Sequence, residues 1–278
     1  MRKKLIATLV AGAVMSTGLI GLTACGGGHD INKGEEVSKE DWAKAITATV
    51  EAKNYTVDAY QEMETKMTGS IEVLGITNLN ISAKTTGEAK NYYDLANGSF
   101  YVNSSVKATV SGVPDELKDE DEFQARDYVM EQYGVKDGEK YFMAYYDGTA
   151  QTPEWSVREM PSIYNNGMAF LFEGDYATEK DGTVATLSEL YDAFTYSGGV
   201  YSATLWEDGD EETKISLSIK GGYVVGYSVE ATHEEGDGNS SMTSSGKYVY
   251  NFSNYGGTTV SASDAAKKAV EDYKASNN

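Results

Sequence analysis

Few side chains in this sequence could act as nucleophiles, acid–base groups or metal ligands. The chain of 278 residues contains one cysteine, Cys25, and two histidines, His29 and His233. A single thiol provides neither a disulfide framework nor a cysteine-based zinc site. His233 precedes Glu234 and Glu235, a setting more typical of a solvated surface residue than of a catalytic base. The chain has no Gly-x-Ser-x-Gly motif and no phosphate loop ending in Gly-Lys-Ser/Thr. We therefore expect no enzyme activity, no cofactor and no resident metal.

Carboxylates are abundant, with 43 acidic residues against 23 basic ones and a net charge of −20. This balance argues against nucleic acid as a partner, because phosphate recognition needs clustered Lys and Arg. Two facing carboxylates could hydrolyse a glycoside, an alternative for which the sequence selects no particular pair. The acidic turns at 206–212 and 235–239 offer oxygen ligands of the kind calcium prefers. Neither has the glycine and final glutamate of an EF-hand loop, so solvated hairpin turns are the favoured interpretation.

The chemistry expected of Cys25 is acylation. Basic residues at 2–4 precede an uncharged, mostly apolar stretch at 5–22, and small residues follow, which is typical of a secretory signal. The residues Leu-Thr-Ala-Cys at 22–25 resemble a bacterial lipobox, in which the cysteine is diacylated through its sulfur and becomes the new N-terminus. The resemblance implies a signal peptide at 1–24 and palmitate-type chains on Cys25. The alternative is an uncleaved membrane anchor with an incidental cysteine.

Residues 25–37 are predicted to form a flexible tether. They include four glycines and show no apolar periodicity, and twelve such residues reach about 20 Å. Removal of residues 1–24 takes away three basic residues and no acidic one, so the mature body becomes still more acidic. Anionic lipid repels such a body. Two acyl chains, which give stable binding where one is marginal, would therefore hold it at the membrane.

The remaining chain, 38–278, is predicted to be one mainly β domain. Apolar residues recur with helical spacing over 38–53, where Ser38 and Asp41 resemble a capping box. The period then changes to two: Tyr55, Val57, Ala59, Gln61, Met63, Thr65 and Met67 share one face of a strand whose other face is wet. The 21 tyrosines against 7 phenylalanines suit such half-exposed strands. Further strands are expected at 70–84, 87–95, 100–110, 128–135, 141–146, 155–157, 200–207, 214–220, 223–231, 247–252 and 258–260.

Two more helices complete the expected elements. Thr186 and Glu189 form a capping box that predicts a short helix at 187–195, and apolar spacing predicts a C-terminal helix at 261–274. The acidic run at 115–122 is expected to be a loop. Strands and helices do not alternate, which disfavours a two-lobed α/β solute-binding protein.

This element order resembles the LolA/LppX-type lipoprotein fold. The matching segments are 42–50 leading into 55–67, the hairpin at 137–141, and the runs at 214–224 and 250–256. The resemblance implies a half-open β-barrel, that is, a curved antiparallel sheet with short helices covering its concave side. It also implies a hydrophobic ligand between sheet and helices, with Met63, Met67, Phe142, Phe170 and Phe172 as candidate lining residues. The alternative is that these side chains simply fill a tight core.

Taken together, the sequence predicts a non-enzymatic, membrane-anchored lipoprotein on the extracytoplasmic face of the cell membrane, at a Gram-positive surface. Its expected partners are the membrane, through acylated Cys25, and a lipid or other amphiphile that it binds or carries. An alternative is a cell-envelope interaction or sensing module that binds a protein or glycan through an exposed aromatic surface. The sequence identifies no protein partner.

Overall fold

The computed structural model describes residues 30–71, 76–118, 124–150, 152–162, 168–207, 211–236 and 240–277. The expected signal peptide, Cys25 and His29 lie outside the described residues, as do parts of both acidic turns, 208–210 and 237–239. None of the described helices is long and apolar enough to cross a membrane.

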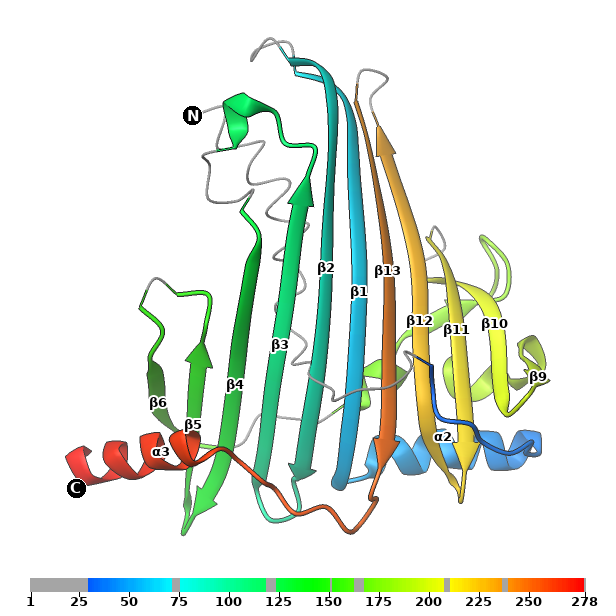
Figure 1. The fold of residues 1–278 in the computed structure, drawn as a ribbon. Helices are drawn as coiled ribbons and strands as arrows, with labels where there is room; N and C mark the ends of the chain where they lie inside the picture. Colours follow the sequence, from blue (N-terminus) through cyan, green and yellow to red (C-terminus); the bar gives the residue numbers. More distant parts are fainter. Residues whose placement is uncertain are drawn as a thin grey trace.

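The described residues form one thirteen-stranded antiparallel sheet (Figure 1). Its central strands β1 and β13 pair directly, from Thr56 opposite Ser253 to Gly69 opposite Ser240, so the first and last strands lie side by side. The strand order is β6-β5-β4-β3-β2-β1-β13-β12-β11-β10-β7-β8, with β9 pairing separately to β10. The strands are β1 (Asn54–Ile71), β2 (Ile76–Asp94), β3 (Ser99–Ser111), β4 (Arg126–Asp137), β5 (Lys140–Asp147), β6 (Trp155–Met160), β7 (Asp175–Ala177), β8 (Ala185–Thr186), β9 (Thr195–Ser197), β10 (Val200–Glu207), β11 (Glu211–Lys220), β12 (Tyr223–Gly236) and β13 (Ser240–Ser253). The mainly β fold class, with a curved antiparallel sheet, is confirmed.

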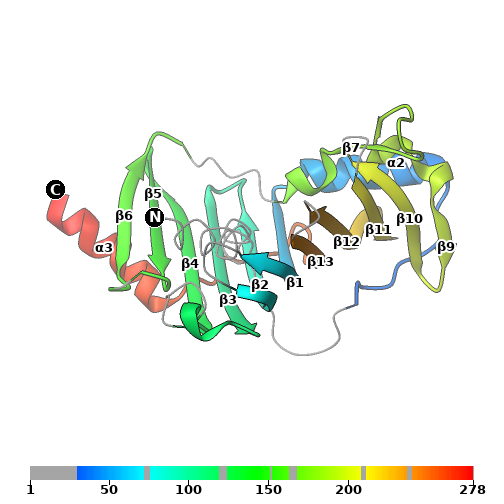
Figure 2. The ribbon, with the colours of Figure 1, turned by 90° about the horizontal axis from the view of Figure 1, so that it is seen from above.

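The sheet curves so that it has a concave and a convex face (Figure 2). Residues at odd positions of β1 face the concave side, where Tyr55, Val57 and Ala59 join the main core. Residues at even positions, such as Asp58 and Glu62, are half-buried on the convex side and pair with lysines there. The predicted two-faced strand at 55–67 is therefore confirmed, and it is longer than predicted.

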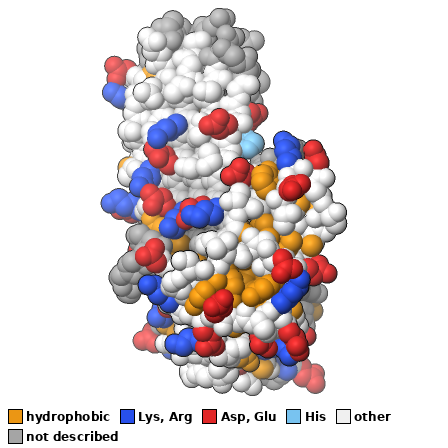
Figure 3. Space-filling view, turned by 90° about the vertical axis from the view of Figure 1, so that its right-hand side faces the viewer, with side chains coloured by type: hydrophobic (Ala, Val, Ile, Leu, Met, Phe, Trp, Pro, Cys, Tyr) orange, Lys and Arg blue, Asp and Glu red, His pale blue; other side chains and the backbone are white. Residues whose placement is uncertain are grey.

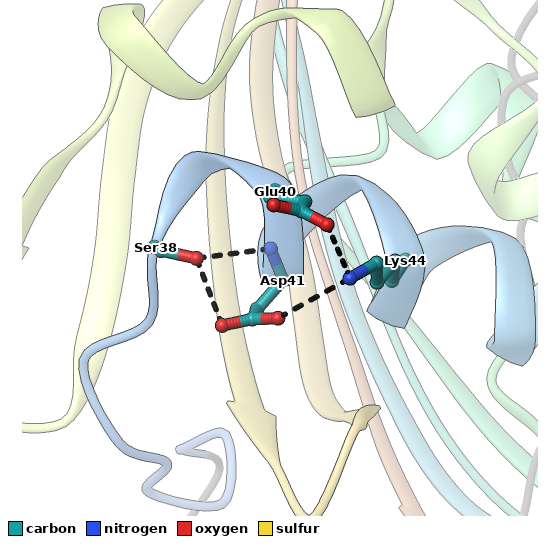
Figure 4. Close-up of polar contacts among 4 residues, drawn as sticks. All are labelled: Ser38, Glu40, Asp41 and Lys44. Carbon is teal, nitrogen blue, oxygen red and sulfur yellow. Dashed lines mark hydrogen bonds and ion pairs between the residues drawn. The ribbon is translucent and has the colours of Figure 1, made fainter.

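Helix α2 (Lys39–Glu51) covers part of the concave face. It begins at Ser38, whose Oγ accepts a hydrogen bond from the Asp41 backbone N–H at 3.2 Å and donates one to the Asp41 carboxylate at 2.8 Å (Figure 4). Lys44 pairs with Glu40 one turn away at 2.5 Å. The cap and the helix predicted at 38–53 are thus confirmed.

The apolar side of α2 packs into the concave face through one large side chain. Trp42 is fully buried and its indole N–H donates a 3.0 Å hydrogen bond to the carbonyl oxygen of Leu187. The rings of Phe194 and Tyr201 lie 4.9 and 5.1 Å from the Trp42 ring, centroid to centroid. Thr49, on the same side of α2, accepts a 2.9 Å hydrogen bond from the backbone N–H of Val224. This contact fastens the helix to β12.

Several predicted elements differ from the structure. The strands expected at 70–84 and 87–95 form one strand, β2, while residues 70 and 71 belong to β1. The helix expected at 187–195 is a pair of single 3-10 turns, η5 (Leu187–Glu189) and η6 (Tyr191–Ala193), although the Thr186–Glu189 capping box is present. The chain must be extended again by Thr195 to pair β9 with β10, which leaves too few residues for a stable α-helix. Residues 258–260 are not a strand, because Thr258 instead exchanges hydrogen bonds with the side chain of Asn54.

The C-terminal helix α3 (Asp264–Asn277) lies on the convex face (Figure 2). Its buried residue Val270 packs on Phe142 and Ala144 of β5, and Lys274 pairs with Asp137 at 2.7 Å. The helix itself is confirmed. Its position on the convex face differs from the arrangement implied by the family resemblance, in which short helices cover the concave side.

Residues 30–37, expected to belong to a flexible tether, are fastened to the sheet. The Asn251 side chain accepts a 2.6 Å hydrogen bond from the backbone N–H of Asn32 and donates a 3.1 Å bond to the Asp30 carbonyl. Further along, the backbone N–H of Gly34 donates to the carbonyl oxygen of Gly199, just before β10, and that of Glu35 donates to the carbonyl oxygen of Ile219 in β11, each at 2.8 Å. Within the expected tether, only residues 25–29 lie outside this described, hydrogen-bonded segment.

Replacing Trp42 with alanine is expected to lower the free energy of unfolding by about 3–5 kcal/mol, because the change leaves a large cavity in the core. Urea denaturation followed by circular dichroism measures the loss. The control is Trp155→Ala, since Trp155 is only half-buried at the edge of the sheet and should cost less. Equal losses in the two variants would contradict the central role of Trp42.

Replacing Asn251 with alanine should loosen residues 30–34, because one side chain bonds to both Asp30 and Asn32. Hydrogen–deuterium exchange should be faster in that segment, while the global stability falls by about 1–2 kcal/mol. Asn80→Ala, at an exposed position on β2, is the matched control. Unchanged exchange at 30–34 in the Asn251 variant would show that the segment does not depend on this side chain.

Candidate functional site

The five candidate lining residues do not form one site. Met63 and Met67 share the concave face of β1 and are half-buried. Phe172 is buried in the core, with its ring 5.2 Å from that of Tyr227, and so fills space. Phe170 in η4 (Ala169–Phe172) is 47% exposed, and Phe142 lies on the convex face beneath α3. Only the two methionines therefore remain as candidates on a common surface.

That surface is the concave face of β1–β4, beyond the part packed against α2. Strand register places Ala59 of β1, Ala89 of β2 and Ser104 of β3 in one row across it. Gly87 lies two residue pairs further along, on the same face and opposite Gln61. We call these four small residues (Ala59, Gly87, Ala89 and Ser104) the small-residue floor; all four are buried.

Gly87 allows the close approach of Gln61. A β-carbon at position 87 would lie 3.1 Å from both Cγ and Nε2 of Gln61, so the Gln61 side chain extends across Gly87. Gln61 is 1% exposed, and Asn91, two positions beyond Ala89 on the same face of β2, is fully buried. Neither amide has a hydrogen-bond partner among the described residues. The concave face thus carries two buried, unpaired carboxamides beside the small-residue floor.

Methionine and tyrosine side chains lie around this floor. Tyr248 of β13 donates a hydrogen bond to the sulfur of Met63 at 3.2 Å, and Tyr145 of β5 donates one to the sulfur of Met130 at 3.7 Å. Burial raises the pKa of the Tyr248 hydroxyl above its ordinary value, and burial followed by the charge of Asp147 does the same for the pKa of Tyr145. Both hydroxyls are therefore neutral hydrogen-bond donors at physiological pH. Flexible methionines beside neutral donors suit a ligand of mixed polarity.

An apolar cluster covers the end of the concave face that lies farthest from α2. Leu117, in the 3-10 turn η2 (Asp115–Leu117), is fully buried against Leu79 and Ile81 of β2, with Met67 packed alongside. This turn belongs to the acidic run at 115–122 expected to be a loop, of which residues 119–122 lie outside the described residues. The described concave face is therefore apolar at this end and polar near Gln61 and Asn91.

The convex face carries a different chemistry. Ion pairs join Lys84 to Glu62, Lys66 to Glu64 at 3.1 Å, and both Lys214 and Lys247 to Glu230 at 3.4 Å. These residues, apart from Lys66 and Lys84, help to line a shallow groove of about 680 Å³. Figure 3 shows acidic and basic side chains interspersed over the surface on the β10 side. Exposed pairs of this kind contribute about 0–1 kcal/mol each and mark a solvated surface.

Three other candidates gain no support in the described part of the chain. No group of three or more His, Cys, Asp or Glu side chains is placed to hold a metal ion there. His233 is exposed on β12, opposite Ser244. The large apolar side chains exposed in the described ranges are Val129, Phe170 and Val184, and these include no tyrosine or tryptophan.

Sequence reasoning missed Gln61 and Asn91 as site residues. One signal was present, because the alternating pattern already placed Gln61 on the same face as Val57 and Met63. The pairing of β1 with β2, which brings Gln61 and Asn91 to one surface, could not be read from the pattern of one strand.

Comparisons with known proteins do not assign a family. No family model and no curated protein matches the chain. Among solved structures, the translocator domain of the autotransporter NalP from Neisseria meningitidis is similar over 71% of this chain and 88% of that one, with 8% sequence identity and a TM-score of 0.25. At that score the likeness carries no argument about function.

Proposed function

We propose that this protein is a non-enzymatic lipoprotein, anchored at the extracytoplasmic face of the membrane through acylated Cys25, that holds a lipid or other amphiphile on the concave face of its sheet. The proposal rests mainly on one observation: the concave face has a part that is packed by helices and a part that is not. α2 and its neighbouring 3-10 turns pack on the side of β10–β13, and their core reaches Ala59 and Ala89 of the small-residue floor. The half-buried Met63 and Met67 of β1 lie beyond that core.

Physical chemistry favours a ligand on this surface. A curved sheet with apolar inward side chains is destabilised unless something covers them, because contiguous apolar area in water is unfavourable. Ala59, Gly87, Ala89 and Ser104 carry short side chains or none, and all four are buried. Apolar side chains at one end and hydroxyl and amide groups near the floor match the two ends of an amphiphile.

The convex face supports the alternative function less well. A module that binds glycans or proteins through aromatic residues needs an exposed aromatic patch, and the described tyrosines and tryptophans are buried or half-buried. Several of them, including Tyr92, Tyr133 and Trp155, pack beside α3.

The anchor is tested by Cys25→Ser. The wild-type chain should fractionate with membranes and gain the mass of two acyl chains, because two chains hold a protein stably in a bilayer. The variant should lose the acyl mass and keep the leader at 1–24. Wild-type protein that retains residues 1–24, with an unmodified thiol, would overturn the anchor and favour an uncleaved membrane segment.

The ligand is tested on a detergent-free, unacylated chain exported through an ordinary secretory signal, with native mass spectrometry as the readout. We expect an excess mass that organic extraction releases. Met63→Lys should lower the bound fraction about tenfold or more, because burying an ammonium group against an apolar ligand is costly.

Val129→Lys, at a 41% exposed position on β4, is the control and should leave binding unchanged. A native mass equal to that of the chain alone, over a range of added amphiphiles, would refute ligand carriage. Equal loss in the two lysine variants would place any ligand away from Met63.

A further inference from the structure

The described residues contain six buried side-chain nitrogen and oxygen atoms without a hydrogen-bond partner, and four of them belong to Gln61 and Asn91. Both amides thus lack a partner for oxygen and nitrogen alike. Folded proteins rarely leave a buried amide unpaired, since each unsatisfied group costs about 1–3 kcal/mol. Two such amides on one face, neither accounted for by the fold, point to a binding role.

The two amides lie along one line on β2. The Gln61 side chain crosses from β1 to rest over Gly87, and Asn91 lies four residues from Gly87 on the same face. At the rise of a strand this separation is about 13 Å. Ala89 lies midway, so the small-residue floor runs between the two amides. A ligand that replaced the present cover of the floor would lie within reach of both amides.

We propose that this line of residues, the two amides with Ala89 between them, recognises a neutral amphiphile that carries both hydrogen-bond donors and acceptors, such as carboxamide groups. This inference rests on the proposed function and specifies its ligand class. Each amide offers an N–H₂ donor and a carbonyl acceptor, so the complementary group must also offer both. Plain hydrocarbon leaves all four polar atoms unsatisfied. A carboxylate supplies acceptors only and brings a charge that neither amide compensates.

The test uses the acylated mature protein in phosphatidylcholine vesicles and a photoreactive fatty amide as the probe. Labelled peptides are mapped by mass spectrometry, and labelling is competed by an unlabelled fatty amide or by the fatty acid of the same chain length. We expect labelling in β1–β3, with the amide competing about tenfold better than the acid. A tenfold difference corresponds to about 1.4 kcal/mol, the scale of one or two neutral hydrogen bonds.

The double variant Gln61→Met with Asn91→Leu keeps similar side-chain volumes and removes both amides. Its preference for the amide over the acid should fall to about parity. Its melting temperature without ligand should equal or exceed that of the wild type, because replacing unsatisfied polar groups by apolar ones of similar shape removes a penalty. Asn80→Leu, on the exposed face of β2, is the matched control and should keep the wild-type preference. If the double variant does not fold, the two single variants provide the same measurements.

The outcomes separate this inference from the proposed function. Labelling of β1–β3 with equal competition by amide and acid would overturn the inference and leave ligand carriage intact. A double variant that still prefers the amide over the acid would likewise overturn the inference and leave ligand carriage intact. Absence of labelling on β1–β3 by the amide probe and by a photoreactive fatty acid would refute both. A lower melting temperature in the unliganded variants would show that the amides are structural, and would also overturn the inference.

Discussion

The antiparallel pairing of β1 with β13 is the contact on which the rest of the structure depends. It joins strands from opposite ends of the chain over Thr56–Gly69 and Ser240–Ser253, and it makes one sheet of the two halves on either side. The helix before β1 and the helix after β13 therefore lie near the same end of the sheet (Figure 1). α2 packs on the concave face and α3 on the convex face, so each half of the sheet has a helix on a different side.

The lengths of the elements explain why the concave face is only partly packed by helix. Eighteen residues of β1 extend about 60 Å, whereas the thirteen residues of α2 extend about 20 Å. α2 runs across the strands near one end, and about 20 Å spans only four of them (Figure 1). Trp42 and the 3-10 turns complete a core there. The rest of the face must be stabilised by other means, and small side chains such as Ala59 and Ala89 reduce the apolar area that needs cover.

Local patterns in the sequence predicted the elements whose formation depends on local chemistry. The alternation at 55–67, the cap at Ser38 and the Asp137–Gly138 hairpin each determine an element without help from distant residues. The two 3-10 turns at 187–193 were not predicted. The capping box is present, but the chain must be extended in β9 to pair with β10, and this limits the length of the helix. The hydrogen-bonded conformation of residues 30–37 was not predicted either, because it depends on Asn251, which is more than two hundred residues away in the sequence. The candidate ligand residues failed to converge because hydrophobicity alone does not tell which face of a strand a residue occupies.

The same limit explains why the sequence placed Gln61 on the inward face of its strand but did not show that its side chain is a buried, unpaired amide. A glutamine at an apparently inward position of a predicted strand has two explanations: either the predicted register of the strand is wrong, or the glutamine is a buried polar group. Only the observed pairing with β2 distinguishes them. The register Gln61–Gly87 is fixed on both sides, since β1 also pairs with β13 along its length. A shift by one residue would expose Tyr55 and Val57 and bury Asp58 instead, at a cost far above that of two unsatisfied amides. The fold is therefore stable with Gln61 and Asn91 buried and does not depend on their amide groups. Their amides make no hydrogen bond to the described part of the protein, so they can bind a ligand.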